Sequence, residues 1–223
     1  MEVVLSKILY KGEIKGSQSD EYIEIANYGD GSADLSGWKV ASSGTNQEFT
    51  FPEGTALASG KKCRVYTNQI NQESGGFSFE HKSALWNDLG STGKLFDDQG
   101  NEVSSISYSS NGKVAISEIG YKGQIKGSQS DEYIAIANHS DKSADLSGWK
   151  VLSSGRNKEF IFPESTSLAS SQTVRVYTDQ INQESGGFSF EYKSALWNDQ
   201  GGTGKLFDAQ GNEVSSYSYQ NSN

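Results

Sequence analysis

The chain has 223 residues, a formal net charge of −9 and a single Cys, and 34% of its residues are hydrophobic. An acidic surface repels phosphate backbones, which argues against nucleic acid as a partner, and one Cys excludes an intrachain disulfide and a cysteine-based zinc site. No apolar run reaches the roughly 20 residues of a membrane-spanning helix, so we expect no integral membrane protein. No basic stretch followed by an apolar one opens the chain, so no signal peptide is indicated.

Apolar and polar residues alternate over short segments of the first half, and this pattern predicts β-strands. In chain order the segments are 20–27, 49–51, 63–67, 77–79 and 103–108. Turn residues separate them, at 28–31, 43–44, 59–60, 75–76 and 99–101, and a further Gly-rich turn is expected at 90–93. Neighbours in a strand point to opposite faces, so Ile23 and Ile25 are expected in the core and Glu24 on an exposed face. No amphipathic helix is apparent, and about seven to nine strands per half are typical of a sandwich.

An internal duplication determines the domain organisation. The segment Gly16–Tyr22 recurs as Gly127–Tyr133, Trp38 recurs as Trp149, and Trp86 as Trp197, with a constant offset of 111 residues. A period of this length is close to one immunoglobulin-size sandwich of about 100 residues. We therefore predict an all-β protein of two tandem immunoglobulin-like β-sandwich domains, 1–112 and 113–223, joined by a short polar segment.

The ordered motifs of both halves resemble the lamin-tail domain family. In the first half they are Glu21–Asn27, Asp34–Trp38, Phe49–Pro52, Leu85–Asn87, Leu95–Asp97 and Gly100–Val103, and the second half carries the same series. The resemblance implies an immunoglobulin-like β-sandwich. It also implies an accessory module of a larger bacterial protein, extracellular or at the cell surface.

Catalytic and cofactor motifs are absent from the sequence, which predicts neither an enzyme nor a bound cofactor. The two histidines, His81 and His139, stand at positions that are not equivalent in the two halves, so neither fits a shared triad. The adjacent acids Asp20 and Glu21 lead into a strand and point to opposite faces, so they are expected to be solvated loop charges. Two loops place acids at alternate positions, which suits either a turn or a Ca²⁺ site; these acids are Asp30, Asp34, Asp141 and Asp145.

The candidate binding residues lie in a polar loop and beside a Trp. In the first half they are Asn71, Glu73 and Trp86, and their twins are Asn182, Glu184 and Trp197. Loops on a rigid sandwich commonly carry recognition, so we expect a polymeric or surface ligand, either glycan or protein. The leading interpretation is a non-catalytic binding, tethering or spacer module. The alternative is a carbohydrate-binding module that assists a secreted hydrolase, and it requires Trp86 or Trp197 to expose its ring for sugar stacking.

Overall fold

The computed structural model describes residues 2–14, 16–125 and 127–222, and these residues contain no helix. The chain divides into two compact units. Unit 1 comprises Met1–Ser107 with Gln220–Asn223, and unit 2 comprises Tyr108–Tyr219. The strands up to the end of β10 are β1 (Val3–Leu9), β2 (Tyr22–Asn27), β3 (Ala33–Asp34), β4 (Lys39–Ser42), β5 (Gln47–Thr50), β6 (Ala56–Leu57), β7 (Lys62–Tyr66), β8 (Phe77–Ser78), β9 (Gly90–Phe96) and β10 (Glu102–Ser110).

The strands that follow repeat this series. They are β11 (Val114–Gly120), β12 (Tyr133–Asn138), β13 (Ala144–Asp145), β14 (Lys150–Ser153), β15 (Lys158–Ile161), β16 (Ser167–Leu168), β17 (Thr173–Tyr177), β18 (Phe188–Ser189), β19 (Gly201–Phe207) and β20 (Glu213–Asn221).

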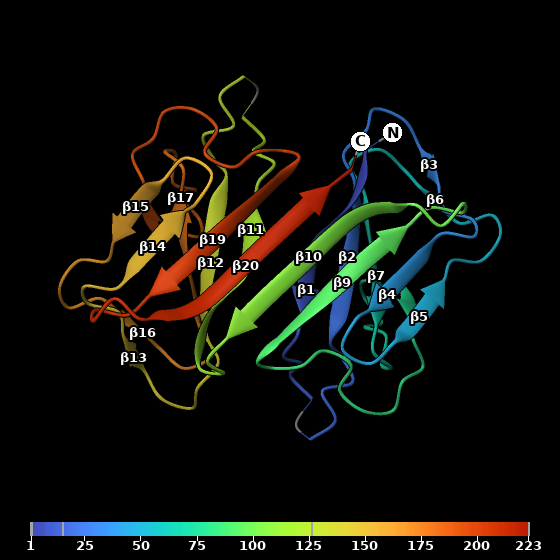
Figure 1. Ribbon diagram of the computed structural model, residues 1–223, viewed down its shortest axis with the longest axis horizontal. Coiled ribbons are helices and arrows are strands. Elements are labelled where there is room, and N and C mark those ends of the chain that lie inside the picture. The colour runs from blue at the N-terminus through green and yellow to red at the C-terminus, as the bar shows by residue number, and fades with distance from the viewer. Residues whose placement is uncertain (1, 15, 126, 223) are drawn as a thin grey trace. The chain divides into compact units, whose positions relative to one another are not determined.

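Each unit is a β-sandwich, which confirms the predicted all-β class. In unit 1 one sheet has the order β1-β2-β7-β8, the opposing sheet has the order β5-β4-β9-β10, and β3 pairs with β6 at the side. Figure 1 shows these two sheets as separate layers. Unit 2 repeats the arrangement with β11-β12-β17-β18, β15-β14-β19-β20 and β13-β16. The apolar core lies between the layers, where Ile23, Ile25, Val40 and Leu95 are completely buried.

The Gly-rich segment 90–93 is a strand, and the prediction of a turn there was wrong. Strand β9 begins at Gly90, and its partner β4 pairs Ser42 with Gly93. A Cβ on Gly93 would lie 2.5 Å from Cδ1 of Ile23 and 2.9 Å from Cδ1 of Ile8. Glycine here lets the strand approach the opposing sheet closely, so it serves packing and not chain reversal.

Glu24 is buried, and the expectation that it faces solvent was wrong. Its side chain is 6% exposed and its carboxylate pairs with Lys62 at 2.8 Å and Arg64 at 3.0 Å. Ser6 donates a third hydrogen bond at 2.9 Å. Burial raises the pKa of Glu24, but the hydrogen bonds and charges of Lys62 and Arg64 outweigh this effect and hold the pKa below its usual value. Neighbouring strands therefore cover the outer face of β2 with charged partners.

In unit 2 the acid on the equivalent outer face of the sheet comes from a different strand. Ala135 replaces Glu24, and Glu118 of β11 stands where unit 1 has a lysine. The Tyr133 hydroxyl donates to Glu118 at 2.7 Å, and the Arg175 guanidinium lies 4.2 Å from the centre of the Tyr133 ring. An acid thus remains near the arginine even though it comes from another strand.

Replacing Cys63 by Val is expected to change stability little. Cys63 lies half-buried opposite Ile25 in the β2–β7 pair, and unit 2 has Val174 at the equivalent position. The expected cost of Cys63→Val is less than about 1.5 kcal/mol of the free energy of unfolding, because the apolar volume is conserved. Urea unfolding of both proteins measures this difference. Burial, with a further contribution from Glu24, raises the thiol pKa to about 12, so rapid labelling of the native thiol near neutral pH would contradict the assignment.

Candidate functional site

The polar loop that contains Asn71 is an ordered turn. The Asn71 side-chain oxygen accepts hydrogen bonds from the backbone N–H groups of Glu73 at 2.9 Å and Ser74 at 3.1 Å. The Ser74 hydroxyl lies 2.7 Å from the Tyr66 hydroxyl, which ties the turn to β7. Unit 2 repeats these bonds around Asn182. Asn71 and Asn182 therefore hold the turn, while the side chains of Glu73 and Glu184 are exposed.

Glu21 is completely buried, so the prediction of a solvated loop charge was wrong. Its Oε2 accepts hydrogen bonds from the backbone N–H of Leu85 at 2.9 Å and Trp86 at 3.4 Å, and from the Thr67 hydroxyl at 3.1 Å. Burial, and to a smaller extent the charge of Asp88, raise the pKa of Glu21 to about 7 although the hydrogen bonds oppose them. Glu132 holds Leu196 and Trp197 in the same way, and its pKa is also about 7. A carboxyl in this position fixes a loop and has no access to a substrate.

Two other acids singled out in the sequence, Asp20 and Asp34, shape loops. Asp20 accepts hydrogen bonds from the backbone N–H of Glu13 at 2.7 Å and Ile14 at 3.1 Å. Asp34 accepts one from the backbone N–H of Ser36 at 2.9 Å. The described residues contain no group of three or more His, Cys, Asp or Glu side chains that could hold a metal ion. The bonds of Asp34 are those of a turn.

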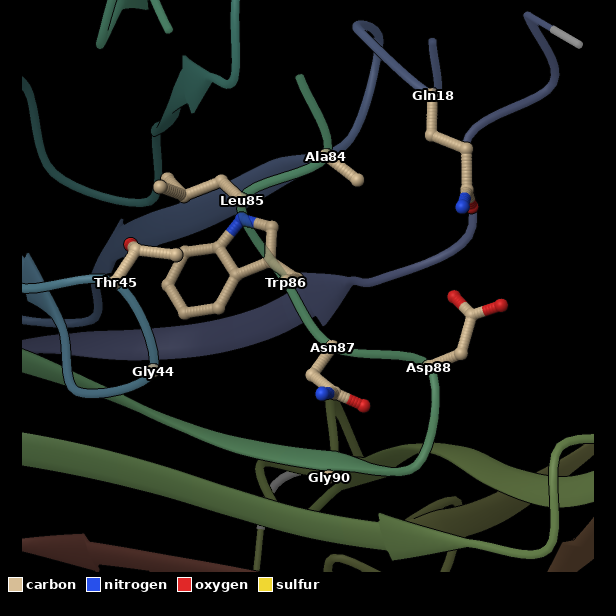
Figure 2. A pocket seen from close by; sticks show the side chains of 9 residues that line it. All are labelled: Gln18, Gly44, Thr45, Ala84, Leu85, Trp86, Asn87, Asp88 and Gly90. Carbon is tan, nitrogen blue, oxygen red and sulfur yellow. The ribbon is translucent and has the colours of Figure 1, made fainter. Parts of the chain in front are cut away.

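The segment that Glu21 anchors forms one wall of a pocket in unit 1. The pocket has a volume of about 390 Å³ and is lined by Gln18, Thr45, Trp86 and Asp88 among others. Figure 2 shows Gln18 and Asp88 extending toward each other on one side of the Trp86 ring, with Thr45 on the other side. Trp86 Nε1 and Thr45 Oγ1 are buried and have no hydrogen-bond partner among the described residues. Buried polar atoms of this kind are normally satisfied by water or a ligand.

Unit 2 has a pocket at the equivalent place with a different charge. Its volume is about 250 Å³, and its lining includes Ser153, Arg156, Trp197 and Asn198. Arg156 stands where unit 1 has Thr45. Ser153 is 1% exposed, and its Oγ and Trp197 Nε1 find no hydrogen-bond partner in the described part of the chain. The pocket is therefore lined by donors that lack an acceptor.

Two features of the structure bear on the sequence-based site. Trp86 is 1% exposed and Trp197 is 3% exposed, so neither ring offers a flat face for sugar stacking, which the carbohydrate alternative required. The pockets are lined by residues of other loops, and neither includes the Asn71 or Asn182 turn. Thr45 and Arg156 were missed, although the Thr-to-Arg difference between the two halves could have drawn attention to them, and Glu21 was considered but taken for a solvated charge.

Comparison with known families gives one match for each half of the duplicated chain. The family model of the Lamin Tail Domain matches residues 1–110 and again residues 108–221. The chain belongs to the lamin-tail domain family. Both halves are therefore lamin-tail domains, with the immunoglobulin-like sandwich predicted from the motifs. No curated protein matches the chain.

Lamin-tail domains are non-enzymatic immunoglobulin-like modules, and this chain carries two of them in tandem. The described residues form no helix that is long and apolar enough to cross a membrane.

Proposed function

We propose that this tandem lamin-tail protein is a non-catalytic binding module that tethers a larger bacterial protein to an extracellular or cell-surface polymer. The observation that carries the proposal is a pocket at the same place in both units, each lined by buried polar atoms that have no partner within the described residues. Two weak sites on one chain gain apparent affinity through effective concentration. Location at a cell surface is supported by the family resemblance.

The absence of catalytic activity is part of this proposal. The acid with the strongest functional signature, Glu21, has a pKa near 7, which suits a proton donor. It is nevertheless 0% exposed and its Oε2 is held by backbone N–H groups. In addition to the pockets, the exposed carboxylates of Glu73 and Glu184 remain candidate contacts to the polymer.

Filling both pockets should abolish retention on isolated bacterial cell envelopes. Gly155 lines the unit 2 pocket, and a Cβ there would meet nothing within 4 Å; a Cβ on Gly44 in the unit 1 pocket would meet only Ser91 Oγ at 3.3 Å. Both positions therefore have room for a tyrosine that blocks the pocket. Each single variant, Gly44→Tyr or Gly155→Tyr, should bind envelopes about 10²-fold more weakly than the parent chain because it loses the avidity of two sites, and the double variant should show no measurable binding.

Gly31→Tyr is the matched control, because a Cβ at Gly31 also meets nothing within 4 Å and this residue lines neither pocket. It should bind like the parent chain. Far-ultraviolet circular dichroism confirms that all variants remain folded. Absence of envelope binding by the parent chain, or equal binding by the double variant, would leave only a spacer role and reject the tether.

A further inference from the structure

The pocket of unit 2 is lined by an arginine that its twin lacks, and this difference indicates what it binds. We propose that the unit 2 pocket binds a carboxylate group of a ligand through Arg156, whereas the unit 1 pocket does not. The inference rests on the proposed function only in assigning ligand binding to these pockets. It adds the chemical class that one of them selects.

The donor set of the unit 2 pocket calls for an acceptor. Trp197 Nε1 can only donate a hydrogen bond, and Arg156 has five N–H donors and no acceptor. Ser153 Oγ is buried in the same wall and, like Trp197 Nε1, has no partner among the described residues. A buried donor without an acceptor is costly, so a ligand that brings acceptor oxygens is favoured over one that brings donors.

Charge and geometry select a carboxylate among the acceptors. The Arg156 side chain is exposed and lines the pocket, and a planar guanidinium pairs with a carboxylate through two parallel hydrogen bonds. Asp199 follows Trp197 and Asn198 in the chain, does not line the pocket, and forms an ion pair with Lys122 at 2.8 Å, so its charge is balanced. The chain carries a net charge of −9, which disfavours a dianion such as phosphate more than a singly charged carboxylate.

Unit 1 shares the buried indole N–H without a partner among the described residues but lacks the arginine at the equivalent place. Thr45 replaces Arg156, and Asp88 lines the pocket directly. The ion pair between Asp88 and Lys11 is longer, at 3.5 Å, than the equivalent pair in unit 2, although Asp88 and Asp199 are about equally exposed, at 40% and 43%. An anion entering this pocket would meet a carboxylate and no arginine, so the two units differ in ligand preference within one fold.

The test uses small probes and the chain of 223 residues with both units. Each Trp gives one indole N–H signal in a ¹H–¹⁵N NMR spectrum, so Trp197 and Trp86 report on their own pockets. Glucuronate is compared with glucuronamide, and N-acetylalanine with N-acetylalanine amide, so each singly charged acid has a neutral partner of nearly the same shape. We expect at least one acid to shift the Trp197 signal saturably while its neutral partner and inorganic phosphate do not. Whether the sugar acid or the amino-acid derivative binds identifies the source of the carboxylate.

Two reciprocal substitutions make the assignment specific. Arg156→Thr should weaken acid binding at Trp197 at least tenfold, and Thr45→Arg should make the Trp86 signal respond to the same acid. Each new residue already occupies the equivalent position of the other unit, so both variants are expected to fold. Equal shifts by acid and neutral probes, binding of phosphate at least as tight as that of the acids, or no effect of Arg156→Thr would each overturn the inference.

The outcome is separable from the test of the tether. Loss of envelope binding on filling the pockets, combined with no acid binding at Trp197, would retain the tether and reject the carboxylate. If the chain binds the acid through Arg156 but does not bind cell envelopes, the carboxylate site is supported and the tether is rejected.

Discussion

Raising the pH from 5 to 8 should lower the free energy of unfolding of each unit by about 2.5 kcal/mol, because Glu21 and Glu132 are buried carboxyls with a raised pKa. The pKa of each is about 7 in the folded chain against an ordinary value of 4.5. Between these values the unfolded chain is ionised and the folded chain keeps its proton. The stabilising contribution is therefore fully present below pH 4.5 and is lost as the pH rises through 7.

Other acids with shifted pKa values act in the opposite direction and outside this pH range. The pKa of Asp34 is lowered by hydrogen bonds from Ser36, and that of Asp97 by hydrogen bonds from Asn101. Groups with a lowered pKa lose their stabilising contribution only when the pH falls below the ordinary carboxylate range. Between pH 5 and 8 they remain ionised, so the two buried glutamates dominate the carboxylate contribution to the change.

Urea unfolding at pH 5 and at pH 8, monitored by tryptophan fluorescence, measures the effect. Glu21→Gln with Glu132→Gln is the matched variant, since an amide oxygen can still accept the backbone hydrogen bonds and carries no titratable proton. It should lose most of the pH dependence, and each single variant should lose about half. A parent chain that is equally stable at both pH values would show that Glu21 ionises without cost and that its burial does not control the pKa.

Replacing Gly76 by Ala should destabilise unit 1 by at least about 3 kcal/mol, because backbone strain and a steric clash add. Gly76 has a φ of 128°, a conformation that L-residues rarely adopt, and a Cβ there would lie 2.5 Å from the Arg64 carbonyl oxygen. The clash involves backbone that is fixed in the β2–β7 ladder and cannot rotate away. Strand β8 begins at the next residue, so its parallel pairing with β7 should be lost as well.

The neighbouring glycine provides the control. Gly75 has a φ of 60° and open space around its Cβ position, so Gly75→Ala should cost only about 1 kcal/mol. Thermal unfolding followed by circular dichroism compares the two variants, and Gly187→Ala with Gly186→Ala repeats the pair in unit 2. Equal losses for Gly75→Ala and Gly76→Ala would mean that the turn, and not the close approach to Arg64, requires glycine at both positions.

The order of motifs along the chain was enough to predict the fold. Duplication of Trp38 and Trp86 at one fixed offset indicated two copies, and alternation around Ile23 and Ile25 indicated strands with one core face. These signals are local or repetitive, so they can be recognised without knowing which strands pair with each other. The ordered motifs also pointed to the lamin-tail family, which the family model confirms over both halves.

Burial and the candidate site required tertiary structure. Alternation places Glu24 opposite the core face, but only the neighbouring strand shows that Lys62 and Arg64 cover it. The sequence likewise places Glu21 beside a strand, whereas its partners at Leu85 and Trp86 lie more than sixty positions away. The pocket joins Thr45 to Trp86 across two loops that no local pattern connects. The sequence by itself thus determined the repeat, the β class and the family, because local pattern specifies them. Long-range packing decided which polar groups are buried, because burial depends on which side chains of other strands lie at the same place.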